Sequence, residues 1–113
     1  MKFTTDKLKN STVVRIDGNI KYDDIQDFVD IVNDLLRQRE KNIIFDLARM
    51  PYINSAVIGQ FISVIKDISS SGGKVVFIGV RPYIQNIFEI SGLMEVFIIK
   101  HDIIEAVRYI SGK

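Results

Sequence analysis

Hydrophobic positions along this chain change their spacing several times, and each change marks a new element of secondary structure. Over residues 23–37 they recur every three or four residues, which predicts an amphipathic helix with one apolar stripe. That stripe consists of Ile25, Phe28, Val29, Val32, Leu35 and Leu36. A second helix is predicted from Ser55, and the Gly-rich stretch 69–73 ends it. Its stripe consists of Ile58, Phe61, Ile62, Ile65 and Ile68.

Short apolar runs separate these helices and predict strands. Residues 43–47 and 74–79 are nearly continuous apolar runs, as in strands that are buried on both faces of a parallel sheet. Residues 2–8 and 12–16 flank a turn and are predicted to pair as an N-terminal hairpin. The remaining elements are a third helix over 82–90, a last strand over 96–99, and a final helix on Ile103, Ala106, Val107 and Ile110.

The resulting order, β-β-α-β-α-β-α-β-α, predicts an α/β fold in a single domain over residues 1–113. Alternating strands and helices favour a mostly parallel β-sheet flanked by helices. The N-terminal hairpin adds an antiparallel edge strand to that sheet. With 113 residues the chain is long enough for one such domain and too short for two.

Composition narrows the range of functions. The chain has 15 Lys and Arg and 14 Asp and Glu, a formal net charge of +1, so we expect no nucleic-acid partner. It has no cysteine and one histidine, His101, which excludes disulfides and thiolate metal sites. No apolar run is long enough for membrane insertion, and the N-terminal segment lacks the apolar core of a signal peptide. We therefore expect a cytoplasmic protein.

Few residues have the surroundings that catalysis requires. Gly72, Gly73 and Lys74 precede a strand, unlike a phosphate-binding loop, which follows one. His101 and Asp102 are neighbours, but adjacency alone makes no catalytic pair, and we interpret His101 as a surface loop residue. Four aspartates share one face of the first helix, and we interpret them as a solvated face rather than a metal site: Asp23, Asp27, Asp30 and Asp34. The sequence thus predicts no catalytic residue, no cofactor, no metal and no enzymatic activity.

The segment Ile53-Asn54-Ser55, at the start of the second helix, is the strongest candidate site. Asn54 or Ser55 is predicted to cap that helix, and such a cap stabilises it by about 1 kcal/mol. The four tyrosines are interpreted as packing residues at the edge of the core. Tyr52 alone stays a site candidate, because it lies in the loop next to Ser55.

Three segments of the chain resemble the STAS domain family. Residues 44–59 (IFDLARMPYINSAVIG) are similar to the family signature, in which a hydrophobic strand leads through a loop to Asp-Ser-Ser/Thr-Gly-Leu-Gly at a helix start. Residues 13–18 (VVRIDG) look like the family's N-terminal half, and residues 88–97 (FEISGLMEVF) resemble its Ser-Gly-Leu motif before the last strand. The resemblance covers nearly the whole chain and implies one STAS domain over residues 1–113.

The resemblance implies a bacterial anti-sigma-factor antagonist, a regulator of transcription that acts through protein-protein interaction. The serine at the position of Ser55 is phosphorylated by the anti-sigma factor, which is itself a kinase. The unphosphorylated antagonist binds that kinase and frees the sigma factor, and a serine phosphatase resets the switch. The domain itself carries out no catalysis and uses no cofactor. The implied partner-binding residues are Tyr52, Ile53, Asn54, Ala56, Val57 and Gly59.

Three residues depart from the signature. Asn54 stands in place of the aspartate, Ala56 in place of the second hydroxyl residue, and Val57 in place of the glycine. We expect Val57 to place a branched side chain on the surface that the kinase approaches. We also expect Met50, Tyr52 and Ile53 in the preceding loop to be exposed, as at an interface.

Two alternatives remain open from the sequence. One is a scaffold that works without phosphorylation, like the STAS subunits of stressosomes or of lipid-transport complexes. The other is a small-molecule binder or enzyme that uses the carboxyl ends of the strands. The sequence also leaves a homodimer open.

Overall fold

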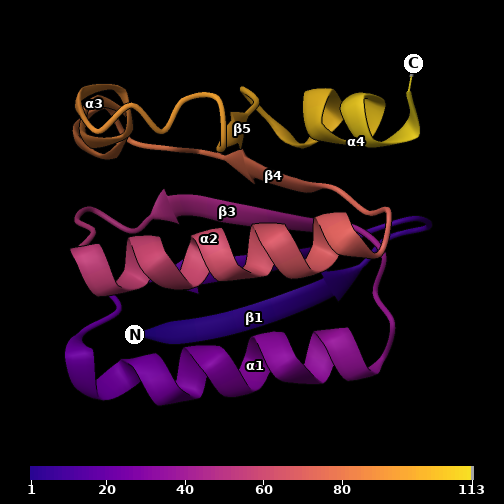
Figure 1. Cartoon of the computed structure of the whole chain (residues 1–113), viewed down its shortest axis with the longest axis horizontal. Coiled ribbons are helices and arrows are strands. Elements are labelled where there is room, and N and C mark those ends of the chain that lie inside the picture. The colour runs from indigo at the N-terminus through magenta and orange to yellow at the C-terminus, as the bar shows by residue number, and fades with distance from the viewer. Residues whose placement is uncertain (113) are drawn as a thin grey trace.

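Five strands form one mixed sheet in the computed structural model, which describes residues 1–112 (Figure 1). The strand order across the sheet follows the chain, and β1 pairs antiparallel with β2 while the other neighbours are parallel. The strands are β1 (Lys2–Lys7), β2 (Thr12–Asp17), β3 (Ile43–Arg49), β4 (Val75–Ile78) and β5 (Ile98–Ile99). The α/β fold with an antiparallel N-terminal edge is therefore confirmed.

The helices cover the two faces of this sheet unequally. Three of them contribute to the larger hydrophobic core on one face, while the fourth packs on the opposite face against Val13, Ile44 and Val76. The helical elements are η1 (Tyr22–Asp24), α1 (Ile25–Arg37), α2 (Ser55–Ser70), α3 (Pro82–Ile90) and α4 (Ile103–Ser111). Among the helices of residues 1–112 only α4 covers the second face, and the part of that face with Arg15, Asp17 and Arg49 stays open to solvent.

Aromatic side chains fill the larger core. Phe61 of α2 lies at its centre, with ring centroids 5.4 Å from Phe28, 5.1 Å from Phe45 and 5.1 Å from Phe77. Phe97 extends the cluster, 5.0 Å from Phe77. All five rings are buried, and such aromatic pairs stabilise a core beyond the area that they bury. The core therefore connects α1 and α2 to the central strands.

Several predicted boundaries differ from the structure. The first helix does not begin at residue 23, because a 3-10 turn covers Tyr22–Asp24 and α1 starts at Ile25. The third strand continues to Arg49, beyond the predicted end at residue 47. The last strand contains only Ile98 and Ile99, because the amides of Val96 and Phe97 bond back to the Leu93 carbonyl in a turn.

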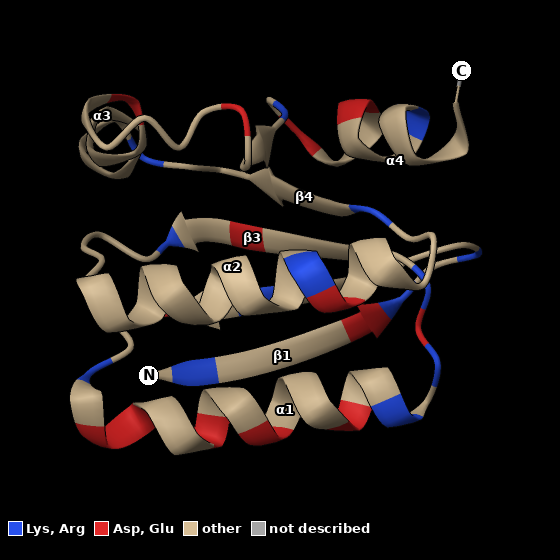
Figure 2. Ribbon diagram, in the orientation of Figure 1, with Lys and Arg blue, Asp and Glu red and all other residues tan. Residues whose placement is uncertain are grey.

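The aspartates of α1 lie in solvent, as predicted. Asp23, Asp27, Asp30 and Asp34 are all exposed, and Figure 2 shows acidic residues recurring along this helix. Asp30 accepts a hydrogen bond from Gln26, and Asp34 pairs with Arg37. Within residues 1–112 no three His, Asp or Glu side chains are grouped so that they could hold a metal ion, and no helix there is long and apolar enough to cross a membrane.

Candidate functional site

Ser55 is the first residue of α2 and is exposed at the edge of the sheet where β3 ends. Asn54 caps the helix, since its Oδ1 accepts a hydrogen bond of 2.9 Å from the Val57 amide. The hydroxyl of Ser55 has no hydrogen-bond partner among the described residues. Of the two residues that sequence left open as the cap, Asn54 is the one, and Ser55 is left available to another molecule.

Two hydrogen bonds fix the loop that leads to Ser55. The Tyr52 amide donates to Asn19 Oδ1 at 3.0 Å, and Asn54 Nδ2 donates to the Ile20 carbonyl at 3.1 Å. Asn54 therefore serves both as the helix cap and as a bridge to the loop after β2. This double use explains how an amide functions in place of the aspartate of the family signature, because a carboxylate has no hydrogen to donate to Ile20.

Val57 is not part of the exposed surface, which corrects the prediction that it faces an approaching kinase. Its side chain is 1% exposed and lies in the larger core. The physical reason is the phase of α2, whose fully buried positions are Val57, Phe61, Val64 and Ile68. The predicted stripe was therefore shifted, since Ile58, Ile62 and Ile65 are only partly buried beside it. Val57 anchors the helix start and obstructs nothing.

The loop before Ser55 is less exposed than predicted. Met50 is fully buried, because the strand β3 turns inward there and the Met50 amide bonds to the Leu47 carbonyl. Ile53 is half-buried against the core, and only Tyr52 is clearly exposed, at 58%. The expectation of three exposed apolar residues is thus wrong for Met50 and confirmed for Tyr52.

The exposed surface next to Ser55 continues along α2. Gly59 lies one turn further on the same face and is exposed, whereas Ala56 is half-buried. Apart from its two chain neighbours and the adjoining backbone of α2, no atom of residues 1–112 would lie within 4 Å of a Cβ atom added at Gly59. The absence of a side chain at Gly59 therefore leaves room beside Ser55 for another molecule.

Two tyrosines that sequence reasoning assigned to packing belong to this surface instead. Tyr83, at the start of α3, is 55% exposed and packs edge-on against Tyr52 with 5.4 Å between the ring centroids. Tyr22 is exposed and joins Tyr52 in lining a hollow of about 250 Å³ that also contains Asn54. The sequence could have indicated this grouping, because Tyr22, Tyr52 and Tyr83 each follow a predicted strand of the parallel sheet. The carboxyl ends of parallel strands meet at one edge of the sheet.

His101, the only histidine of the chain, is not part of the surface around Ser55. His101 is exposed in the loop after β5, which confirms its interpretation as a surface residue. Asp102 Oδ1 accepts a hydrogen bond of 2.9 Å from the Glu105 amide and so caps α4. Asp102 is therefore a structural residue and not an orienting partner for His101.

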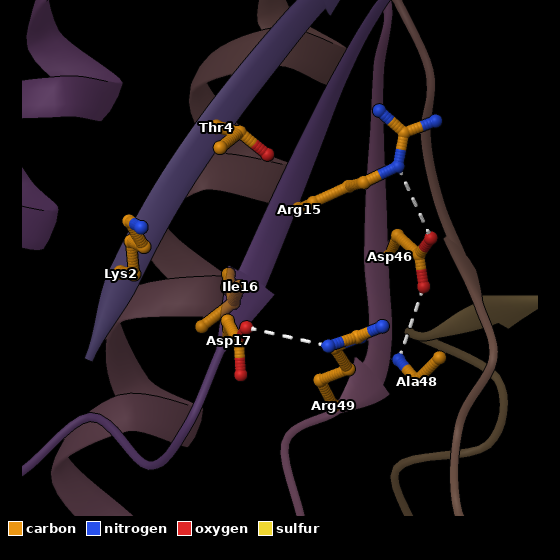
Figure 3. Close-up of a pocket in the computed structure, with 8 residues that line it drawn as sticks. All are labelled: Lys2, Thr4, Arg15, Ile16, Asp17, Asp46, Ala48 and Arg49. Carbon is orange, nitrogen blue, oxygen red and sulfur yellow. Dashed lines mark hydrogen bonds and ion pairs between the residues drawn. The ribbon is translucent and has the colours of Figure 1, made fainter.

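A second hollow, of about 360 Å³, lies on the open face of the sheet and contains none of the predicted site residues (Figure 3). Its walls carry paired charges: Arg15 Nε lies 3.6 Å from Asp46 Oδ2, and Arg49 Nη1 lies 3.7 Å from Asp17 Oδ2. Asp46 also accepts a hydrogen bond from the Ala48 amide at 3.0 Å. Lys2 belongs to neither pair, so three basic and two acidic side chains line this hollow.

Solved structures of known proteins share this fold. The anti-sigma factor antagonist SpoIIAA in its unphosphorylated form superposes with a TM-score of 0.82 at 17% identity, over 99% of this chain and 98% of that one. The phosphorylated form of SpoIIAA from Bacillus gives 0.74 at 16% identity, over 96% and 98%. The Thermotoga maritima protein TM1081 gives 0.91 at 20% identity, over 96% and 94%. At these identities the likeness concerns the fold.

Sequence comparison gives the family. BtrV of Bordetella bronchiseptica, named as an anti-sigma factor antagonist, is 26% identical over 97 residues, covering 86% of this chain and 84% of that protein. The family model of the STAS domain matches residues 2–107. The match takes in both Ser55 at the start of α2 and all five strands of the sheet. The chain belongs to the STAS domain family.

Proposed function

We propose that this protein is an anti-sigma-factor antagonist that is switched by phosphorylation of Ser55. In its unphosphorylated state it binds an anti-sigma factor with serine-kinase activity and so releases a sigma factor. The kinase transfers a phosphoryl group from ATP to Ser55, which ends the binding, and a serine phosphatase removes the group again. The chain supplies no catalytic group in this scheme.

The observation that carries this proposal is that Asn54, and not Ser55, caps α2. Because Asn54 already caps α2, the hydroxyl of Ser55 is exposed and needs no internal partner. A helix start in which the serine itself was the cap would have to lose a stabilising hydrogen bond before it could react. Here the acceptor hydroxyl is free without any change in the fold.

The surroundings of Ser55 suit a phosphate as a reversible signal. A phosphoserine adds about 1.5 to 2 negative charges, and a helix N-terminus stabilises such charge by about 0.3–1 kcal/mol. The first turn of α2 contains no acidic residue that would repel it. Phosphorylation should therefore leave the fold intact and act on the complex, where a covering partner surface would have to desolvate the dianion.

The proposed partner surface comprises the open helix face and the neighbouring loop. Tyr52 and Tyr83 present two large exposed rings in mutual contact, and tyrosines are frequent anchors of protein interfaces. Ser55 and Gly59 present a helix face without bulky side chains. Ile53, Asn54 and Ala56 would contribute at the margin, since they are half-buried, and Val57 would support the helix from inside.

The test is an affinity capture from lysate of the native host with four baits, identified by mass spectrometry. The baits are the wild type, Ser55→Ala, Ser55→Asp and the matched control Ser63→Asp, which puts the same charge on an exposed position of α2 two turns away. We expect an ATPase of the histidine-kinase-like type with every bait except Ser55→Asp. The captured kinase with ATP should then phosphorylate the wild type and not Ser55→Ala.

A shared set of captured proteins for all four baits would contradict the switch and favour the scaffold that works without phosphorylation. Thermal unfolding of each bait controls for misfolding. Because Ser55 and Ser63 are both exposed, each aspartate variant should unfold within about 0.5 kcal/mol of the wild type.

A further inference from the structure

The open face of the sheet carries two rows of polar and charged side chains. On β2 and on β3, the charge in one row is opposite in sign to the charge in the other row. The first row runs across β1, β2 and β3 through Thr4, Arg15 and Asp46, which are register partners in the sheet. The second row lies nearer the carboxyl ends of β2 and β3 and runs through Lys2, Asp17 and Arg49. It is offset by two residues on β2 and by three on β3, because the register of the two strands shifts between the rows. Figure 3 shows all six side chains on the same face of the three strands.

This face is unusual because parallel strands are normally covered on both sides. Helix α4 covers only the apolar part, around Val13, Ile44 and Val76. The charged rows remain in solvent, with Arg15, Asp17 and Arg49 all exposed. An uncovered half of a sheet that also forms a hollow of about 360 Å³ is a surface on which another molecule can sit.

The two rows are complementary to each other position by position. On β2 the first row has Arg15 and the second has Asp17, and on β3 the first has Asp46 and the second has Arg49. On β1 a hydroxyl, Thr4, corresponds to an ammonium donor, Lys2. A surface with this pattern matches its own copy after a twofold rotation about an axis that runs between the rows.

We propose that the open face of the sheet binds the same face of a second copy of this chain. In this dimer Arg15 lies opposite Asp17 of the partner subunit, and Asp46 lies opposite Arg49 of the partner subunit. Twofold symmetry doubles each of these pairs, as an isologous interface requires. Lys2 reaches Thr4 of the partner subunit at the β1 end of the rows, and the symmetric contact lies beside it.

A second copy fits this face better than an unrelated protein does. Self-complementarity of four charges under one rotation is what a twofold dimer requires. The intramolecular pairs Arg15–Asp46 and Arg49–Asp17 become members of larger networks, in which each of these four charges gains an opposite neighbour from the partner subunit. Arg15 also keeps its pair with Asp6 of its own chain. Because the contact is polar and rimmed by solvent, the dimer should be weak and sensitive to salt.

Charge reversal and mixing of variants test the proposal on the purified chain. Arg15→Asp places two aspartates opposite each other at both symmetric positions, and Asp17→Arg places two arginines there. Each variant alone should self-associate at least about tenfold more weakly than the wild type, because like charges then face each other. A 1:1 mixture restores opposite charges at both positions, so it should form the heterodimer.

Sedimentation equilibrium between about 10 µM and about 1 mM protein measures these associations in the range expected of a small interface. The matched control Asp27→Arg reverses an exposed charge on α1, over the other face, and should dimerise like the wild type. Circular dichroism and thermal unfolding verify that every variant is folded. Rescue by mixing cannot arise from a folding defect, because two misfolded chains do not repair each other.

Three results would overturn the proposal: a wild type that stays monomeric throughout the range, a dimer that both reversals leave unweakened, and a mixture that associates no better than its components. The inference does not rest on the proposed function, because Ser55 is not in this interface and no partner protein is needed. Loss of the dimer with the kinase interaction intact, or the converse, would separate the two.

Discussion

The two faces of the sheet differ although the same strands, β2 and β3, form both, because successive side chains of a strand point to opposite faces. On one face Val14, Ile16, Phe45 and Leu47 are buried beneath α1 and α2. On the other face the same strands begin with Val13 and Ile44 beneath α4 and then change to charged side chains. One face is therefore a continuous apolar core, and the other is half core and half ion pairs.

This difference indicates that the covered face of the sheet supplies most of the stability, while the open face is available for binding. Removal of apolar area from water stabilises the covered face, with about 25 cal/mol for each Å² buried. Exposed ion pairs contribute little to folding, since water and salt screen them. The charged half of the sheet can therefore vary in sequence, or bind another chain, without much effect on the stability of the fold.

The largest effect should follow from a cavity in the covered face. Phe61→Ala removes the ring that contacts Phe28, Phe45 and Phe77, and its position is fully buried. We expect a loss of about 3–5 kcal/mol in the free energy of unfolding, measured by urea denaturation. The matched change on the open face, Thr4→Ala, should cost less than about 0.5 kcal/mol. Equal losses at the two positions would contradict the division between the faces.

An intermediate effect should follow at an ion pair whose carboxylate is largely shielded from water, although its lysine is exposed. Glu40 is 9% exposed in its side chain, and its carboxylate lies 3.0 Å from Lys7 Nζ. The hydrogen bond from Lys7 holds the pKa of Glu40 below its ordinary value, against the opposing effect of burial. At neutral pH, Glu40→Gln should therefore lower the free energy of unfolding by about 1 kcal/mol.

The sign of the pH dependence follows from the lowered pKa. A carboxylate with a lowered folded-state pKa stabilises the fold above its unfolded pKa, and this contribution is lost as the pH falls through the folded value. The difference between the wild type and Glu40→Gln should thus be constant near pH 7 and shrink below the ordinary carboxyl pKa of about 4.3. A difference that stays unchanged into acid would show that charge is not involved.

The smallest effect should follow on the open face. Arg15 pairs with Asp6 and Asp46 while 48% of its side chain remains exposed. Arg15→Met should lower the free energy of unfolding by no more than about 1 kcal/mol, measured on dilute monomer, and the loss should shrink at high salt. Arg15→Lys serves as the charge-preserving control. A loss above about 3 kcal/mol would mean that this network stabilises the fold as a buried one does.

The sequence was sufficient to predict most of the fold. Apolar spacing in residues 23–37 and the apolar runs at 43–47 and 74–79 led to α1, β3 and β4 with small errors at their ends. The errors fell at Tyr22–Asp24 and Val96, where turn hydrogen bonds decide the conformation. Periodicity describes element interiors well, because it reports which side chains a regular element buries on one side.

The candidate site was predicted less completely. Ser55 was found from a local motif, but Asn54 could be chosen as the cap only from its hydrogen bonds to Val57 and Ile20. Val57 was misplaced because the apolar residues of α2 cover a face wider than the part that packs in the core, so their spacing alone does not define which of them are buried. Tyr83 was missed because it is far from Ser55 in sequence.

The sequence by itself determined the order of strands and helices, the α/β class and the serine at the start of α2, because each depends on residues close together in the chain. Only the tertiary structure decided that Val57 is buried, that Tyr52 touches Tyr83, and that two rows of opposite charge meet on one face of the sheet. Those outcomes depend on strand register and on the rotation of helices against the sheet. Contacts between distant segments decide both, and local spacing alone does not.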